Sequence, residues 1–174
     1  SLVGSEMCIR DRLYIMINDE LTKEIMLKCV QLARESAKTK QYPIAAIVTN
    51  HDGTILSMAK SNLRQGNDPT NHPEIDAIRG ACKKLDTRFL RGCYLYTTLE
   101  PCPMCTSAAI WARMQGIVYG AYLEDIEQFI VNNPARKFSW RQIPIKARDI
   151  IKFGTPSLEV YEGVLREECM QLFC

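Results

Sequence analysis

The sequence predicts an α/β fold in which a mixed β-sheet is covered by helices on both faces. A helical apolar stripe comes first, two short strand-like runs joined by a turn follow, and strand-like runs then alternate with helical segments. The 174 residues suffice for one domain with a full hydrophobic core. Apolar residues make up 47% of the chain and charged residues 24%, which is ordinary for a soluble globular protein.

The first half of the chain predicts a helix and a hairpin. Asn18 and Asp19 can cap a helix, and an apolar stripe follows at helical spacing (Leu21, Ile25, Cys29, Leu32, Ala33 and Ala37). The β-rich run 44–49 predicts a buried strand. His51-Asp52-Gly53 supplies turn chemistry, so residues 54–59 are expected to return as its hairpin partner.

The second half alternates helices and strands. Pro73 and Pro103 each suit the first position of a helix, because proline has no N–H to leave unpaired there. The expected helices are 73–85, 103–114, 124–130 and 164–172, and the expected strands are 93–98, 116–121 and 158–161. Residues 132–144 are the least regular part.

The formal net charge of +2 is too small to argue for nucleic-acid or membrane binding. No apolar run approaches the roughly 20 residues that span a bilayer, so we expect a soluble cytoplasmic protein without a membrane partner. Residues 6–11 resemble the translation of a DNA sequencing adapter. Residues 1–12 are therefore interpreted as a non-native leader and 13–174 as a single domain, the alternative being a natural, poorly ordered N-terminus.

The stretch from Asn71 to Cys105 carries the residues with chemistry. It combines H-x-E at 72–74 with P-C-x-x-C at 101–105, thirty residues from histidine to first cysteine. Zinc binds thiolates and imidazole tetrahedrally, and a catalytic site keeps one position for water. His72, Cys102 and Cys105 supply three such ligands. Both half-motifs fall at predicted helix starts, where unpaired N–H groups and the helix dipole favour thiolates.

Glu74 lies two residues beyond His72 and is not needed as a ligand. Zinc makes water acidic, and a nearby carboxylate can take its proton and return it to a leaving amine. A bare C-x-x-C could equally be a redox pair or half of a structural zinc site. The joint pattern H-x-E…P-C-x-x-C is typical of zinc nucleobase deaminases and favours a catalytic zinc with Glu74 as the proton shuttle.

Residues 20–173 resemble the cytidine-deaminase-like superfamily, in the branch of guanine deaminases and tRNA-specific adenosine deaminases. Three segments carry this resemblance: Asn62-x5-Asp68-Pro69-Thr70-x-His72-x-Glu74-Ile75, then 95–105 (LYTTLEPCPMC), then 118–121 (VYGA). The resemblance implies a three-layer α/β/α sandwich with a mixed five-stranded sheet. It also implies a single deaminase domain over 13–174 that is commonly a homodimer.

The resemblance further implies two substrate-binding residues. Asn62 matches an asparagine that bonds the substrate in the family, the alternative being a loop-capping asparagine. Trp111 matches a tryptophan near the pocket of guanine deaminases, although a helix tryptophan is more often core. The chain departs from the family pattern at Pro73, inside the motif, and at Ile44, where an aliphatic residue is closer to the tRNA enzymes. Residues 122–125 also lack the Lys- and Gly-rich segment of tRNA-type sequences.

The function expected from the sequence is zinc-dependent hydrolytic deamination of an amino-substituted nucleobase or nucleoside, with a guanine-type purine favoured. The first alternative is a tRNA-specific adenosine deaminase. The second is a non-catalytic zinc-binding partner subunit, whose mark would be loss of the glutamate, and Glu74 is present. Residues 136–148 carry basic and aromatic side chains that could contact RNA. They could equally form a lid, a dimer contact or a solvated loop, so RNA binding is not favoured.

Overall fold

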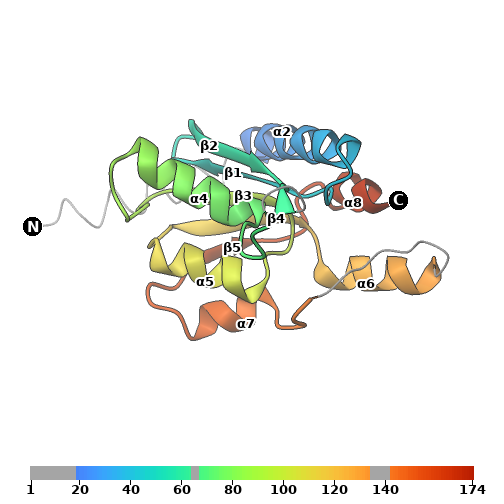
Figure 1. Cartoon of the computed structure of the whole chain (residues 1–174). Coiled ribbons are helices and arrows are strands. Elements are labelled where there is room, and N and C mark those ends of the chain that lie inside the picture. The colour runs from blue at the N-terminus through green and yellow to red at the C-terminus, as the bar shows by residue number, and fades with distance from the viewer. Residues whose placement is uncertain (1–18, 64–66, 134–141) are drawn as a thin grey trace, which may run out of the picture.

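A five-stranded mixed sheet forms the centre of the computed structural model, which describes residues 19–63, 67–133 and 142–174 (Figure 1). The strand order is β2-β1-β3-β4-β5. Strand β1 is antiparallel to both β2 and β3, whereas β3, β4 and β5 are parallel. The strands are β1 (Ala45–Thr49), β2 (Ile55–Lys60), β3 (Tyr94–Leu99), β4 (Gly116–Ala121) and β5 (Glu159–Tyr161).

The sheet has one hydrophobic core on each face. Successive side chains of a strand point to opposite faces, so Ala45 and Ile47 of β1 join one core while Ala46 and Val48 join the other. The first core is completed by α2 (Asp19–Lys38), α6 (Leu123–Asn132) and α8 (Arg166–Met170). The second is completed by α4 (Pro73–Lys84), α5 (Pro103–Trp111) and α7 (Ala147–Lys152). The predicted α/β/α sandwich with a mixed five-stranded sheet is therefore confirmed (Figure 1).

All five expected strands are present, each within one or two residues of its predicted limits. The helix expected over 103–114 ends earlier, at Trp111, because Ala112 caps it and Arg113 adopts a left-handed conformation with φ of 54°. Helix α7 was not predicted. Its six residues bury only Ala147 and Ile151, which is too short an apolar pattern to indicate a helix.

Several expectations from the sequence concern residues outside the described part. These are the leader 1–12 and most of the irregular segment 132–144, including the aromatic and basic residues 136–141. Among the described residues, no helix combines the length and the apolar character that a membrane crossing requires.

The connections after β3 and before α4 position the functional residues. Strand β3 ends at Leu99, and only Glu100, Pro101 and Cys102 separate it from α5. Helix α4 packs against β1 and β2, and it also contacts α5 and β3. Binding sites of open α/β sheets lie outside the carboxyl ends of the parallel strands. The N-termini of α4 and α5 meet at that edge of the sheet.

Candidate active site

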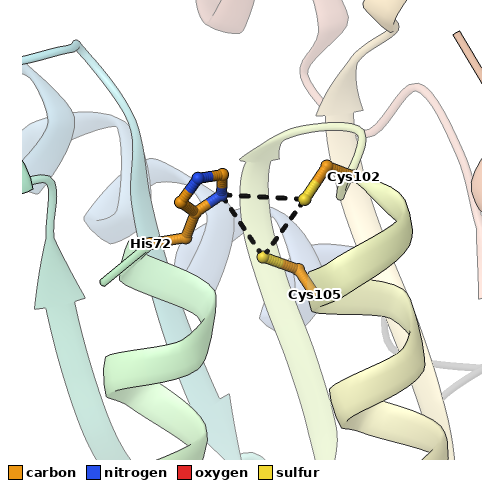
Figure 2. Close-up of side chains that lie close together, drawn as sticks. All are labelled: His72, Cys102 and Cys105. Carbon is orange, nitrogen blue, oxygen red and sulfur yellow. Dashed lines mark hydrogen bonds between the residues drawn. The ribbon is translucent and has the colours of Figure 1, made fainter. Parts of the chain in front are cut away.

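Three predicted metal ligands lie at the starts of two neighbouring helices. His72 is the N-cap residue of α4, Cys102 is the N-cap residue of α5, and Cys105 lies in the first turn of α5. Proline follows each N-cap residue, as expected. Figure 2 shows the imidazole and the two sulfur atoms pointing toward one another from the two helix ends. The structure thus brings together residues that are thirty positions apart in the sequence.

The distances between these ligand atoms fit a zinc ion. His72 Nδ1 lies 3.7 Å from Cys102 Sγ and 3.5 Å from Cys105 Sγ, and the two sulfur atoms are 3.6 Å apart. Tetrahedral zinc with ordinary bond lengths separates two sulfurs by about 3.8 Å and a sulfur from a nitrogen by about 3.6 Å. The three atoms form a metal-ligating group among the described residues. Three protein ligands leave the fourth tetrahedral position for water or substrate.

The two thiols differ in acidity because they are hydrogen-bonded to each other. The two sulfur atoms are hydrogen-bonded at 3.6 Å, and this bond, together with the contact to His72, lowers the pKa of Cys102 to about 4 although burial opposes the shift. The same bond, followed by burial and the nearby Glu74 carboxylate, raises the pKa of Cys105. Zinc binds both cysteines as thiolates, so metal uptake is expected to release a proton from Cys105.

Glu74 is buried beside the ligands, with only 4% of its surface exposed. The Thr97 hydroxyl on β3 donates to Glu74 Oε1 at 3.1 Å, and Cys105 Sγ lies 3.6 Å from Oε2. Burial raises the pKa of Glu74, because a carboxylate removed from water loses solvation. A carboxyl group with a raised pKa, held in one orientation beside a metal site, is suited to accept and return a proton.

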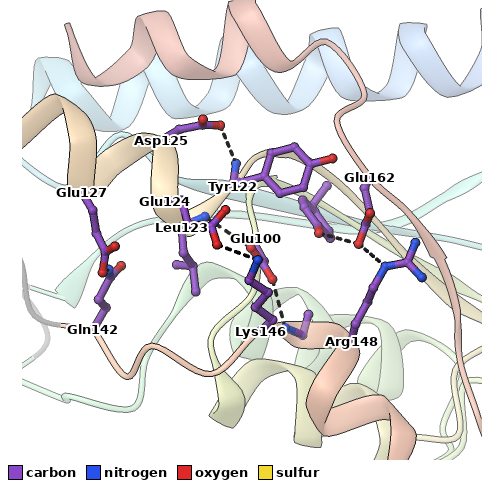
Figure 3. Close-up of polar contacts among 12 residues, drawn as sticks. Glu100, Tyr122, Leu123, Glu124, Asp125, Glu127, Gln142, Lys146, Arg148 and Glu162 are labelled. Atoms are coloured by element: carbon purple, nitrogen blue, oxygen red, sulfur yellow. Dashed lines mark hydrogen bonds and ion pairs between the residues drawn. The ribbon is translucent and has the colours of Figure 1, made fainter.

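Two polar side chains, Thr106 and Glu100, hold the loop that carries the cysteines. Thr106 Oγ1 donates to the Pro101 carbonyl at 3.1 Å. Glu100 is 3% exposed, and its carboxylate accepts backbone hydrogen bonds from Leu123 N at 3.3 Å and Ala147 N at 3.0 Å, the first residues of α6 and α7 (Figure 3). Glu100 therefore connects the metal loop to two helix N-termini. The sequence signal for this role is the position of Glu100, because a carboxylate at the end of a buried strand needs hydrogen-bond donors nearby.

A cavity of about 440 Å³ opens onto the ligands. Its described lining contains two carboxylates and no lysine or arginine, and about half of its residues are apolar. The lining residues are Tyr42, Ile44, Ser61, Leu63, Pro69, His72, Pro73, Glu74, Leu99, Glu100, Cys102, Leu123 and Gln142. Two of the three departures from the family pattern, Ile44 and Pro73, lie in this wall. A pocket of this size and polarity suits a small planar ligand of low charge.

The two predicted substrate-binding residues do not line this cavity. Asn62 is exposed, although Ser61 and Leu63 on either side of it are lining residues. Trp111 is 83% exposed at the last residue of α5. It lies six residues after Cys105, which corresponds to about 9 Å along the helix axis and away from the metal end.

Ser61 is a pocket residue that the sequence did not indicate. It is 3% exposed, and its hydroxyl oxygen has no hydrogen-bond partner among the described residues. Its backbone is held on both sides, since Ser61 N donates to the Ile44 carbonyl at 3.0 Å and Ser36 Oγ donates to the Ser61 carbonyl at 3.0 Å. The sequence signal for Ser61 was its position at the end of the hairpin, where buried and exposed side chains alternate.

Comparison with known proteins identifies the family. Residues 19–121 match the family described as the cytidine and deoxycytidylate deaminase zinc-binding region. The chain belongs to this family. The description names zinc, and His72, Cys102 and Cys105 are placed to hold it. Two curated relatives are much longer than this chain, and their matches to it cover only 19% and 16% of their own length.

Relatives of both expected kinds are similar to this deaminase-family chain. A guanine deaminase of Bacillus subtilis is 46% identical over 79 residues, which is 45% of this chain and 50% of that one. A tRNA-specific adenosine deaminase of the same species is 33% identical over 155 residues, covering 88% and 85%. The solved structure of a guanine deaminase from Nitrosomonas europaea has a TM-score of 0.71 at 27% identity, covering 85% and 80%. These matches include both guanine deaminases and tRNA-specific adenosine deaminases.

Proposed function

We propose that this protein hydrolytically deaminates an amino-substituted nucleobase or nucleoside, with a guanine-type purine as the favoured substrate. One observation carries the proposal. A buried glutamate, Glu74, lies 3.6 Å from a metal-ligating sulfur and lines the same cavity as His72 and Cys102. A structural zinc site needs no such carboxylate, whereas a hydrolytic site needs a group that moves protons.

The residues divide the chemistry between them. A zinc ion held by His72, Cys102 and Cys105 supplies water activation at neutral pH. Glu74 accepts the two protons of the attacking water one after the other, and it passes the first to the ring nitrogen and the second to the departing amine. The oxygen of water bonds to the amino-bearing carbon, the C–N bond breaks, and ammonia leaves with a carbonyl in its place. The hydrogen bond from Thr97 holds the Glu74 carboxylate in orientation throughout.

The cavity supports a base or nucleoside rather than a nucleotide. Its described lining carries the carboxyl groups of Glu74 and Glu100 and no lysine or arginine, so a phosphate placed there would meet repulsion from the carboxylates with no such side chain to bind it. Apolar wall residues such as Ile44 and Leu99 suit the flat faces of a heteroaromatic ring. The similarity to guanine deaminases in sequence and in structure supports a guanine-type purine.

A tRNA-specific adenosine deaminase is the second candidate. Two observations favour it: the relative of that kind matches over 155 residues, and Ile44 in the pocket wall is aliphatic. The adenosine would then enter the same cavity from an RNA loop, with its base turned out of the stack. The catalytic roles of Glu74 and of the three ligands would be unchanged.

Ammonia release from a panel of substrates tests the proposal. The zinc-loaded protein is assayed with guanine, guanosine, adenine, cytosine and a tRNA anticodon stem-loop, and guanine is expected to react fastest. The Glu74→Gln variant should keep its zinc and lose about 100- to 10,000-fold in kcat, the range typical of a general acid–base group. Reaction of the stem-loop alone would support the second candidate. Full activity in Glu74→Gln, or no reaction with any compound in the zinc-loaded protein, would refute the deaminase assignment.

A further inference from the structure

A second charged site lies at the opposite end of the sheet from the metal ligands. Three arginine side chains converge on the ring of Phe89: the guanidinium carbons of Arg88, Arg91 and Arg113 lie 4.7, 5.1 and 4.4 Å from the ring centroid. These distances are typical of cation–π contacts, in which an aromatic face holds the guanidinium in place. One phenylalanine thus fixes three positive charges within a small region of the surface.

The three guanidinium groups lack acidic partners. None of them forms an ion pair with a carboxylate among the described residues, whereas Arg148 pairs with Glu162 and Arg166 with Asp125. The carboxylate of Glu159 lies in the adjoining strand β5, but it accepts hydrogen bonds from Gln115, Tyr94 and Tyr161. The like charges around Phe89 repel one another, so an anion bound between them would be attracted by all three.

A cavity of about 580 Å³ adjoins this cluster. Arg91 and Arg113 line it together with the hydroxyl-bearing residues Thr155 and Ser157, and no carboxylate lines it among the described residues. Its volume lies within the range of about 300–1,000 Å³ that is usual for small-ligand sites. Guanidinium and hydroxyl groups are both hydrogen-bond donors, and the fork of an arginine matches the oxygens of a phosphate.

The sheet topology separates this cavity from the metal site. Its residues directly precede the parallel strands β3, β4 and β5, whereas Cys102 and Cys105 follow the carboxyl end of β3. The six residues of β3 correspond to about 20 Å at the usual rise per residue. A small ligand therefore cannot occupy both sites at once.

We propose that Arg91 and Arg113, held against Phe89 with Arg88, form a binding site for a phosphoryl group that is separate from the deaminase pocket. The phosphate belongs either to a small molecule such as a nucleotide or to the backbone of an RNA. In both cases it accepts hydrogen bonds from the two guanidinium groups and from the hydroxyls of Thr155 or Ser157. This site does not depend on the proposed deamination.

Binding of phosphate probes to the zinc-loaded full chain tests this site. Titration calorimetry is performed with pyrophosphate, a nucleoside 5′-triphosphate and a single-stranded RNA of about 12 nucleotides, at about 50 and about 200 mM salt. The Arg91→Glu/Arg113→Glu variant should lose binding at least about 10-fold, since each guanidinium contact with an anion is charge-assisted. Arg91→Ala, at an exposed position, gives a milder variant whose affinity should fall about 5-fold.

The matched control reverses two charges elsewhere. Lys28→Glu/Arg34→Glu alters exposed residues of α2, on the other face of the sheet, and changes the net charge by the same amount. Retained binding in this control together with loss in the Arg91/Arg113 variant supports the site. A response to the small phosphates assigns a nucleotide-like ligand, and a response to RNA alone assigns a nucleic-acid backbone. The proposal is overturned if no probe binds the unaltered protein, or if both double variants lose affinity equally.

Discussion

Glu100→Gln is expected to loosen the link between the metal loop and the two helices beside the pocket. The Glu100 carboxylate is buried and accepts hydrogen bonds from Leu123 N and Ala147 N (Figure 3). A glutamine keeps one acceptor oxygen but turns its NH₂ toward the other N–H, so one bond is lost and two donors face each other. A hydrogen bond to a charged group contributes about 1.5–3 kcal/mol.

The neutral side chain also removes the cost of burying a charge, which offsets part of this loss. The carboxylate, however, lies at the N-termini of two helices, where each dipole stabilises an anion by about 0.3–1 kcal/mol. We therefore expect the free energy of unfolding to fall by about 2 kcal/mol. For a chain of this length that corresponds to a fall in Tm of roughly 4–8 °C.

Urea unfolding and amide hydrogen exchange of the zinc-loaded protein measure this effect. The amides of Leu123 and Ala147 should exchange faster in Glu100→Gln than in the unaltered protein. Glu124→Gln is the matched control, because Glu124 is exposed and pairs only with Lys146 at the surface. Such pairs contribute less than about 1 kcal/mol. If Glu100→Gln is as stable as the unaltered protein and both amides stay protected, the bridging role of this carboxylate is wrong.

Three further changes have expected outcomes. Although burial opposes ionisation, hydrogen bonds from Arg166 and the Tyr122 amide lower the pKa of Asp125. This stabilisation is present above about pH 4 and is lost as the pH falls through the lowered pKa. Asp125→Asn should therefore have a smaller free energy of unfolding than the unaltered protein at neutral pH. Urea unfolding of the two proteins should show this difference disappearing in acid. Cys102→Ser should lose zinc to a chelator faster than Cys174→Ser, as measured by metal analysis, because Cys102 belongs to the metal-ligating group and Cys174 does not. Ser61→Ala removes a buried hydroxyl that has no partner among the described residues, so the Tm should stay the same or rise. The affinity for the base, measured by calorimetry, should fall about 10-fold. A lower Tm with unchanged affinity would contradict a ligand-facing role of this hydroxyl.

The metal ligands could be predicted from the sequence because the geometry within each half of the motif is local. Each lies at or just after a helix start, and a proline marks both starts. Spacing within one helical turn places Cys102 and Cys105 side by side, and the intervening strand brings His72 to them. Glu74 follows from the same turn of α4. Within each half these positions depend on short-range rules that a sequence displays directly. The meeting of the two halves was inferred from their joint pattern.

The pocket wall could not be predicted in the same way, because it is assembled from distant segments. Ser61 comes from the end of a hairpin, Leu123 from the start of α6, and Gln142 from the segment before α7. Asn62 and Trp111 were inferred from a family pattern, and neither side chain lines the cavity. A shift of one residue along an extended segment turns a side chain to the opposite face, so neighbouring Ser61 and Asn62 differ completely in burial. Helix α7 escaped prediction for a related reason, since its two buried residues are too few to show a period.

The predictable and the unpredictable parts of the site are physically joined at Glu100. This residue directly precedes the Pro-Cys pair of the metal loop, and its carboxylate binds the first N–H groups of α6 and α7. Leu123, whose amide it accepts, is itself a pocket residue. A change in the wall that moves α6 or α7 would therefore pull on the loop that carries Cys102. Substrate preference and metal geometry are for this reason expected to vary together in this fold, and variants of the wall should be compared by zinc affinity as well as by kcat/KM.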